Sequence, residues 1–223
     1  MSAMIQPDEI IRTRRKTLAI TIDAFGRLIV RAPHRCDESR IFAFIQEKES
    51  WILRKKAEKQ GAGIELPPEN LDGYEIMLLG KKCKIHVIET AMVRYDRETP
   101  ALYLPSKKTK ERLLKWLKDN AKRIFAAATA NAAERMDVTY KSVSVNSAKS
   151  RWGSCSHENA IHYSFRLIYA PKEVVEYVIV HELAHTKYKN HSKAFWAEVE
   201  KYVPDWKQKR KWLKLHGALM EIF

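Results

Sequence analysis

The sequence contains few cysteines, glycines and prolines, and it has no long hydrophobic run. Only three cysteines occur in 223 residues (Cys36, Cys83 and Cys155), and their odd number and wide spacing exclude a disulfide framework and a cysteine-based zinc ribbon. Seven glycines and eight prolines exclude a collagen-like chain. No run of about 18 apolar residues is present, so no membrane-spanning helix is expected. Residues 1–16 lack the apolar core of a secretory signal, and we expect a cytoplasmic protein.

Acidic residues are outnumbered by basic ones. The chain has 27 Asp and Glu against 41 Lys and Arg, which gives a formal net charge of +14. A surplus of this size raises the local concentration of anions, so nucleic acid, nucleotides, acidic protein segments and anionic membranes all fit as partners. Charge alone does not identify one of them. The hydrophobic content of 45% is that of a folded chain and excludes a disordered one.

The first part of the chain favours β-structure with one helix. Alternating apolar residues predict a hairpin of two strands at 17–22 and 27–31. Apolar residues spaced three and four apart predict a helix at 37–60. Further short strands of an antiparallel sheet are expected at 74–79, 82–89, 92–95 and 101–104.

The second part of the chain is mainly helical. Its expected strands lie at 142–146, 150–152 and 160–165, and its expected helices at 107–136, 171–187, 192–202 and 204–216. We therefore predict an α+β fold in two parts. Residues 1–105 form a mainly antiparallel N-terminal sheet with one helix, and residues 106–223 form a helical core with a small sheet.

The most informative motif is HExxH at residues 181–185. His181 and His185 are four residues apart, so on a helix they share one face and can bind one metal ion. Imidazole nitrogen suits Zn²⁺. Glu182 projects beside the two histidines and can reach a water at the metal without being a ligand. The apolar run at 174–180 predicts a buried helix, in which these polar side chains would be costly without a partner.

A catalytic zinc usually has three protein ligands and one open position. His191 is the leading candidate for the third ligand, because it follows His185 by six residues, where the helix should have ended. A new helix beginning near Ser192 would then carry Phe195 and Trp196 towards the core.

A second motif, Arg151-Trp152-Gly153-Ser154, precedes the HExxH helix. Gly153 allows close approach of the backbone, and a short strand here could pair with an extended substrate. Arg151 could bind a carboxylate or a phosphate. Arg151, Trp152 and Ser154 are our candidate substrate-binding residues, and the alternative is a core Trp152 beside a structural ion pair of Arg151. Candidate donors to the oxyanion are Arg151, His157, His162 and Tyr188.

Three segments together resemble the YgjP-like metallopeptidases of bacteria, a family similar to the SprT-like and WLM zinc peptidases. They are residues 150–156, residues 177–185, and His191-Ser192 with the following Phe195-Trp196. The resemblance implies a zincin-type catalytic core behind a family-specific N-terminal region. It also implies zinc on three histidines, here His181, His185 and His191, and a general base at Glu182.

The main hypothesis is a zinc-dependent peptidase that acts on a peptide or protein. A nucleotide pyrophosphatase is an alternative, because a metal-activated water does not by itself select carbonyl over phosphoryl, and Arg151 favours an anionic substrate. A third hypothesis is a DNA-associated, SprT-like protease or a binding protein. The Lys- and Arg-rich stretch at 107–123 motivates it, although no dedicated nucleic-acid motif is present.

Overall fold

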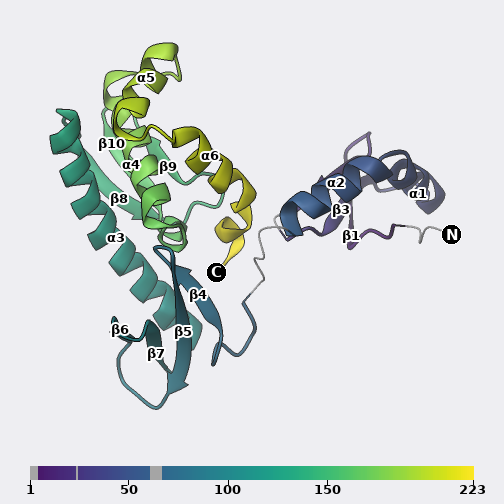
Figure 1. Cartoon of the computed structure of the whole chain (residues 1–223). Helices are drawn as coiled ribbons and strands as arrows, with labels where there is room; N and C mark the ends of the chain where they lie inside the picture. The colour runs from purple at the N-terminus through teal and green to yellow at the C-terminus, as the bar shows by residue number, and fades with distance from the viewer. Residues whose placement is uncertain (1–4, 24, 61–66) are drawn as a thin grey trace. The chain divides into compact units, whose positions relative to one another are not determined.

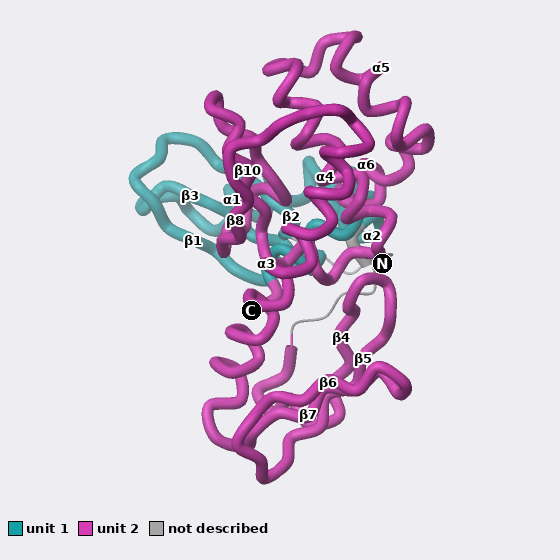
Figure 2. The backbone as a smooth tube through the Cα atoms, turned by 90° about the vertical axis from the view of Figure 1, so that its left-hand side faces the viewer, with its two compact units in different colours: residues 1–66, 215–221 teal, residues 67–214, 222–223 magenta. Residues whose placement is uncertain are grey.

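The computed structural model describes residues 5–23, 25–60 and 67–223. The chain separates into two compact units, which are coloured separately in Figure 2. Unit 1 comprises Met1–Leu66 and Leu215–Glu221, and unit 2 comprises Pro67–Lys214 and Ile222–Phe223. The predicted domain boundary near residue 105 falls within unit 2 and stays a prediction.

Unit 1 contains a three-stranded sheet in the order β1-β3-β2, of which Figure 1 labels β1 and β3. The central strand β3 (Leu28–Pro33) pairs antiparallel with β2 (Ala19–Ile22), which confirms the predicted hairpin. It also pairs in parallel with β1 (Glu9–Thr13), a strand that the sequence did not predict. The segment Glu-Ile-Ile-Arg-Thr has its two apolar residues side by side, so it lacks the alternation that marks a half-buried strand.

The helical part of unit 1 consists of two helices where the sequence predicted one. They are α1 (Glu38–Glu47) and α2 (Glu49–Gln60). Lys48 leaves the helical conformation between them (φ −101°, ψ 11°). The apolar spacing continues across the break, so the pattern could not reveal it. Alternate residues of β3 pack on the helices, and the fully buried core is Leu28, Val30, Ala32, Ile41, Ile45 and Ile52.

Unit 2 begins with a four-stranded sheet in the order β4-β5-β7-β6. Its strands are β4 (Glu75–Leu78), β5 (Lys81–Ile88), β6 (Arg94–Asp96) and β7 (Ala101–Pro105). The two outer pairs are antiparallel, as predicted, but the central pair β5–β7 is parallel. The sheet is thus two hairpins joined side by side, an arrangement that the pattern of each strand cannot specify.

The long helix α3 (Thr109–Met136) contacts both sheets of unit 2. The second sheet, in the order β8-β10-β9, has β8 (Ser142–Asn146), β10 (Ala160–Ser164) and β9 (Gly153–Cys155). The predicted strand at 150–152 was wrong by three residues. The turn after Cys155, closed by the Ser156 N–H donating to the Ala160 carbonyl at 2.8 Å, sets the register.

The chain ends in a 3-10 helix η1, three α-helices and a short η2. These elements are η1 (Phe165–Tyr169), α4 (Lys172–Lys187), α5 (Lys193–Tyr202), α6 (Trp206–Leu215) and η2 (Gly217–Glu221). Helix α4 lies against α3, α5 and β9, and most of its residues are buried. The predicted α+β class is confirmed. In the described part of the chain, no helix combines the length and apolarity needed to cross a membrane.

Phe125 anchors α3 to the second sheet of unit 2. Its side chain is fully buried and meets the Tyr163 ring edge-on, with centroids 5.6 Å apart. We expect Phe125→Ala to lower the free energy of unfolding by about 3–5 kcal/mol, because it leaves a cavity where an aromatic ring was packed. Urea denaturation measures this loss. The exposed Lys122→Ala on the same helix should change stability by less than about 0.5 kcal/mol.

Candidate metal centre

Helix α4 places two histidines and a glutamate at one point in the interior of unit 2. His181 and His185 lie one turn apart, with ring centroids 5.0 Å apart. The preceding residues are buried almost without interruption (Val174, Val175, Tyr177, Val178, Ile179 and Val180). The predicted buried helix is therefore confirmed, and it carries the HExxH motif into the core.

His191 comes back to the same point after α4 has ended. The C-cap Tyr188 is extended, and α5 begins directly after Ser192, whose side chain accepts the Phe195 N–H at 3.3 Å. The Nε2 atoms of His191 and His181 are 3.1 Å apart. One potential ligand atom from each of the three histidines lies within 4.8 Å of the other two.

Neighbouring groups orient two of these rings. His185 Nδ1 donates to the carbonyl of Tyr188 at 2.9 Å, which leaves Nε2 of His185 as the lone-pair nitrogen. The His191 ring stacks on Trp196 (centroids 5.5 Å, interplanar angle 23°), and Trp196 stacks on Trp206 (4.0 Å, 16°). A hydrogen bond and an aromatic stack thus fix the rings from two sides.

Burial favours the neutral, metal-binding form of His181 and His185. Burial lowers the pKa of His181 to about 3, with smaller contributions from His185 and His191, so its imidazole is neutral at physiological pH. Burial also lowers the pKa of His185. Two nitrogens bound to one tetrahedral Zn²⁺ lie roughly 3.3 Å apart, given bonds of about 2.0–2.1 Å. The observed 3.1 Å between Nε2 atoms fits this donor set.

Glu182 lies beside the histidines and is only 5% exposed. Burial raises the pKa of Glu182 to about 8, and the charge of Arg151 opposes this shift. The strand β9 passes very close to this side chain. A Cβ atom built on Gly153 would lie 2.7 Å from Oε1 and 2.9 Å from Cγ of Glu182. Only glycine leaves room for the carboxylate at this position.

The three histidines and Glu182 open onto a pocket of about 310 Å³, which is also lined by Arg151, Gly153, Ser154, Cys155 and Lys189. Two of the three predicted substrate-binding residues, Arg151 and Ser154, are therefore at the pocket, whereas Trp152 is half-buried and does not line it. Arg151 is exposed, and no ion pair between described residues involves it.

The other predicted donors are outside the pocket lining. His157 is exposed, and Nδ1 of His162 lies 2.6 Å from the Ser144 hydroxyl. Tyr188 contributes its carbonyl to His185. The sequence did not single out Lys189, whose ammonium donates to the carbonyl of Ser156 at 3.3 Å. Its place in the sequence, between the HExxH motif and His191, could have indicated that Lys189 lies at the pocket.

Two histidines and a glutamate on one helix, with a third histidine in the loop that follows this helix, are typical of HExxH metallohydrolases. The comparison with protein families gives the narrower assignment. The model of the YgjP-like metallopeptidase domain matches residues 16–216, and the chain belongs to this family of metallopeptidases. No curated protein sequence matches the chain.

Two solved structures are similar to part of the chain. One is the metallopeptidase zymogen abylysin of Pyrococcus abyssi, 24% identical, covering 40% of this chain and 92% of its own with a TM-score of 0.37. The other is the metallopeptidase zymogen jannalysin of Methanocaldococcus jannaschii, 20% identical, covering 43% of this chain and 96% of its own with a TM-score of 0.37.

Proposed function

We propose that this protein is a zinc-dependent peptidase, with the metal held by His181, His185 and His191 and with Glu182 as general base. The observation that carries the proposal is the convergence of three imidazoles beside a buried glutamate in a member of a metallopeptidase family. We further propose a cytoplasmic location, because the three cysteines are free thiols, which suits a reducing compartment.

Zinc bound by these histidines would supply Lewis-acid activation at the scissile carbonyl. Glu182 would accept a proton from the attacking water on its carboxylate and deliver it to the leaving amine. Burial raises the pKa of Glu182 to about 8, which helps the side chain to hold this proton between the two steps. The charge of a bound divalent metal would lower that pKa and so leave the carboxylate free to accept the proton.

The edge of the second sheet supports an extended peptide as the substrate. Strand β9 is an edge strand, and both Gly153 and Ser154 line the pocket. An extended peptide can add to such an edge through backbone hydrogen bonds. Arg151 and Trp152, directly before β9, would then contact substrate residues beyond the scissile bond.

Hydrolysis of a phosphoanhydride is a second candidate function. Arg151 and Lys189 put two cations at the pocket, and Glu182 is the only acidic residue in its lining among the described residues. This charge balance suits an anionic substrate such as a nucleoside triphosphate. The chemistry of a metal-activated water is compatible with either bond.

The test combines metal analysis with parallel substrate assays. The purified chain should contain one zinc per molecule and should cleave members of a mixed peptide library. Nucleoside triphosphates are assayed under the same conditions. Release of phosphate or pyrophosphate without any peptide cleavage would replace the peptidase with the second candidate, and a chain that binds no divalent metal would remove both.

Gly153 provides a prediction about the position of the general base. Gly153→Ala should reduce kcat by about 10–100-fold with little change in KM, because the new methyl group displaces the Glu182 carboxylate. Zinc content should stay the same. Steady-state kinetics with metal analysis measure these effects.

Ser154→Ala is the matched control, since it changes the next residue of the same strand without adding an atom near Glu182. It should keep kcat within about threefold of the native value, and because Ser154 is a candidate substrate-binding residue its loss should appear in KM instead. Equal losses in the two variants would mean that β9 is generally sensitive and that Gly153 has no special relation to Glu182.

A further inference from the structure

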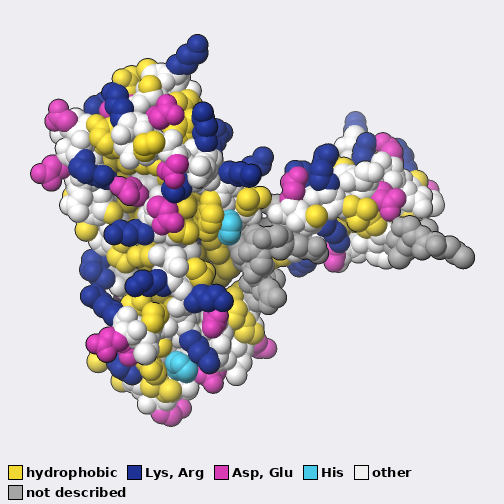
Figure 3. Space-filling model, viewed as in Figure 1, with side chains coloured by type: hydrophobic (Ala, Val, Ile, Leu, Met, Phe, Trp, Pro, Cys, Tyr) yellow, Lys and Arg dark blue, Asp and Glu magenta, His cyan; other side chains and the backbone are white. Residues whose placement is uncertain are grey.

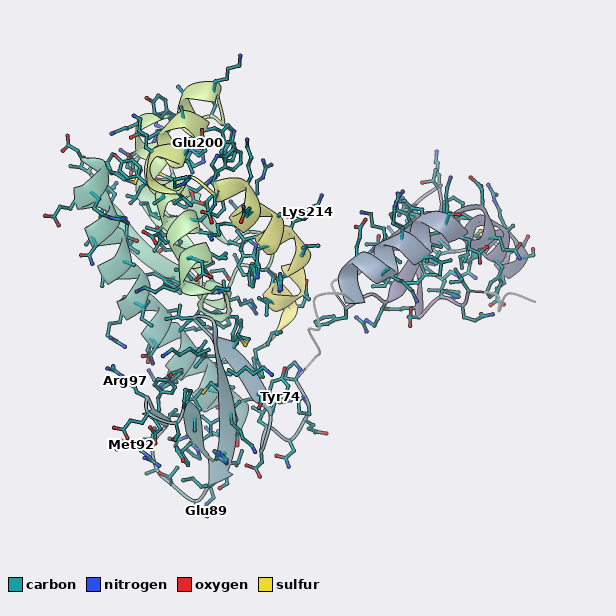
Figure 4. The ribbon with its side chains drawn as sticks, viewed as in Figure 1. Tyr74, Glu89, Met92, Arg97, Glu200 and Lys214 are labelled. Carbon is teal, nitrogen blue, oxygen red and sulfur yellow. The ribbon has the colours of Figure 1, made fainter. Side chains whose placement is uncertain are left out.

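A larger cavity, outside the metal centre, lies between α3 and the four-stranded sheet of unit 2. Its volume is about 660 Å³. Four cationic residues from different elements line it, namely Lys81, Arg97, Arg123 and Lys172, together with the aromatic pair Tyr95 and Trp116. No acidic residue belongs to its lining in the part of the chain that the structure describes. Figure 4 labels Arg97 beside the N-terminal half of α3.

None of these four cations has an acidic partner in the part of the chain that the structure describes. Among described residues, no ion pair within 4.0 Å involves any of them. By contrast, Lys115 on the same helix pairs with Asp119 at 3.0 Å. Cations that line one cavity without counter-charges make the local potential positive, which favours an anionic ligand.

A second cavity of about 420 Å³ continues the first along α3. The two share Leu79, Ile124 and Lys172, and together we call them the α3 groove. Leu79 is at the junction and has a positive φ of 51°. Its N–H donates to the Ile168 carbonyl at 2.8 Å, which ties the turn between β4 and β5 to η1.

The two halves of the groove have different chemistry. The second half is apolar and is lined by Ala128, Ala132, Val175 and Ile179, with Asn131 also present. Its rim carries Arg135 and Glu176, which pair with each other at 2.7 Å. Figure 3 shows hydrophobic side chains interspersed with Lys and Arg on this side of unit 2. The groove therefore runs from an unpaired cationic end to an apolar end.

The length of the groove distinguishes between small and extended ligands. Trp116 at one end and Arg135 at the other are 19 positions apart on one helix, which is about 28 Å at roughly 1.5 Å per residue. An extended peptide of about eight or nine residues spans this distance at roughly 3.3 Å per residue. A small organic anion would fill only the cationic half.

We infer that the α3 groove binds an extended segment of another protein, with acidic side chains at the cationic end and aliphatic side chains at the apolar end. A single-stranded nucleic acid fits less well, because its phosphates would continue into the apolar half and past Glu176. The site does not include the metal centre, so it acts as a docking surface whether or not the proposed peptidase function holds.

The test is a fluorescence-anisotropy titration of the full-length protein. The probe is a fluorescein-labelled peptide of about nine residues, half Asp and Glu and half Leu and Val. The protein carries Glu182→Gln so that the probe stays intact. Charge reversal at Arg97→Glu with Arg123→Glu should weaken binding by about tenfold or more. Lys110→Glu with Lys122→Glu, the same charge change at exposed α3 positions outside the groove, should weaken it by less than about threefold.

The apolar half is tested separately with Ala128→Trp, which fills the groove, and with Ala127→Trp, which places the same side chain on the exposed face of α3. Only Ala128→Trp should weaken binding. Circular dichroism melting confirms that each variant is folded. Three results would overturn the proposal: no binding of the probe at low salt, equal losses in groove and control variants, or tighter binding of an oligonucleotide that the same groove variants abolish.

Discussion

Glu182→Gln is expected to reduce hydrolysis by about 10²–10⁴-fold while the protein keeps its zinc. Glutamine has nearly the same shape as glutamate, so it should fit beside Gly153 without moving β9. It cannot accept a proton from the water at neutral pH, however, and the step that Glu182 is proposed to perform is lost. The measurement is kcat with the best substrate from the parallel assays, combined with metal analysis.

Glu198→Gln separates this loss from a general effect of neutralising a buried carboxylate. Glu198 is 4% exposed and accepts hydrogen bonds from Lys187 at 3.1 Å and Lys201 at 2.7 Å. Its replacement should lower the midpoint of thermal unfolding and leave kcat nearly unchanged. A Glu182→Gln variant with native turnover would show that the general base has been assigned to the wrong residue.

His191→Ala is expected to weaken zinc binding by more than about 10²-fold. Removing a residue that only supports a metal ligand already weakens binding by about 10–100-fold, and this substitution removes a proposed ligand itself. The exposed position of His191 makes the substitution mild for folding, since no packed core side chain is lost. Competition with a chromophoric chelator measures the affinity. Activity should fall in parallel at limiting zinc.

His162→Ala is the matched control for this loss. It removes an imidazole of unit 2 that contacts Ser144 and does not line the pocket at the metal centre. Its zinc affinity should equal that of the native protein. If His191→Ala also binds zinc as tightly as the native protein, the third ligand is another residue and the three-histidine centre is wrong.

The parts of the molecule that the sequence predicted well depend on short spacings. His181 and His185 share a helix face for geometric reasons, and a run of buried residues before them is visible in the sequence. His191 could be connected to them because only a brief turn separates two predicted helices. The convergence of the three histidines could therefore be predicted without knowing how the sheets pair.

What the sequence did not predict depends on pairing between distant segments. Strand β9 begins at Gly153 because its register with β10 is set by the turn after Cys155, and no local pattern gives that register. The parallel pairing of β5 with β7 is likewise a property of the assembled sheet. Lys81 and Lys172 are 91 positions apart in the sequence, so the α3 groove became visible only in the folded chain.

The stacked indoles of Trp196 and Trp206 have an optical consequence. The chain has six tryptophans, but this pair is in direct ring contact, and one member of it stacks on His191. A paramagnetic ion such as Co²⁺ bound at the proposed metal centre would quench the emission of these two rings more strongly than that of the more distant ones. Tryptophan fluorescence would then report whether the proposed centre holds a metal, without an added label.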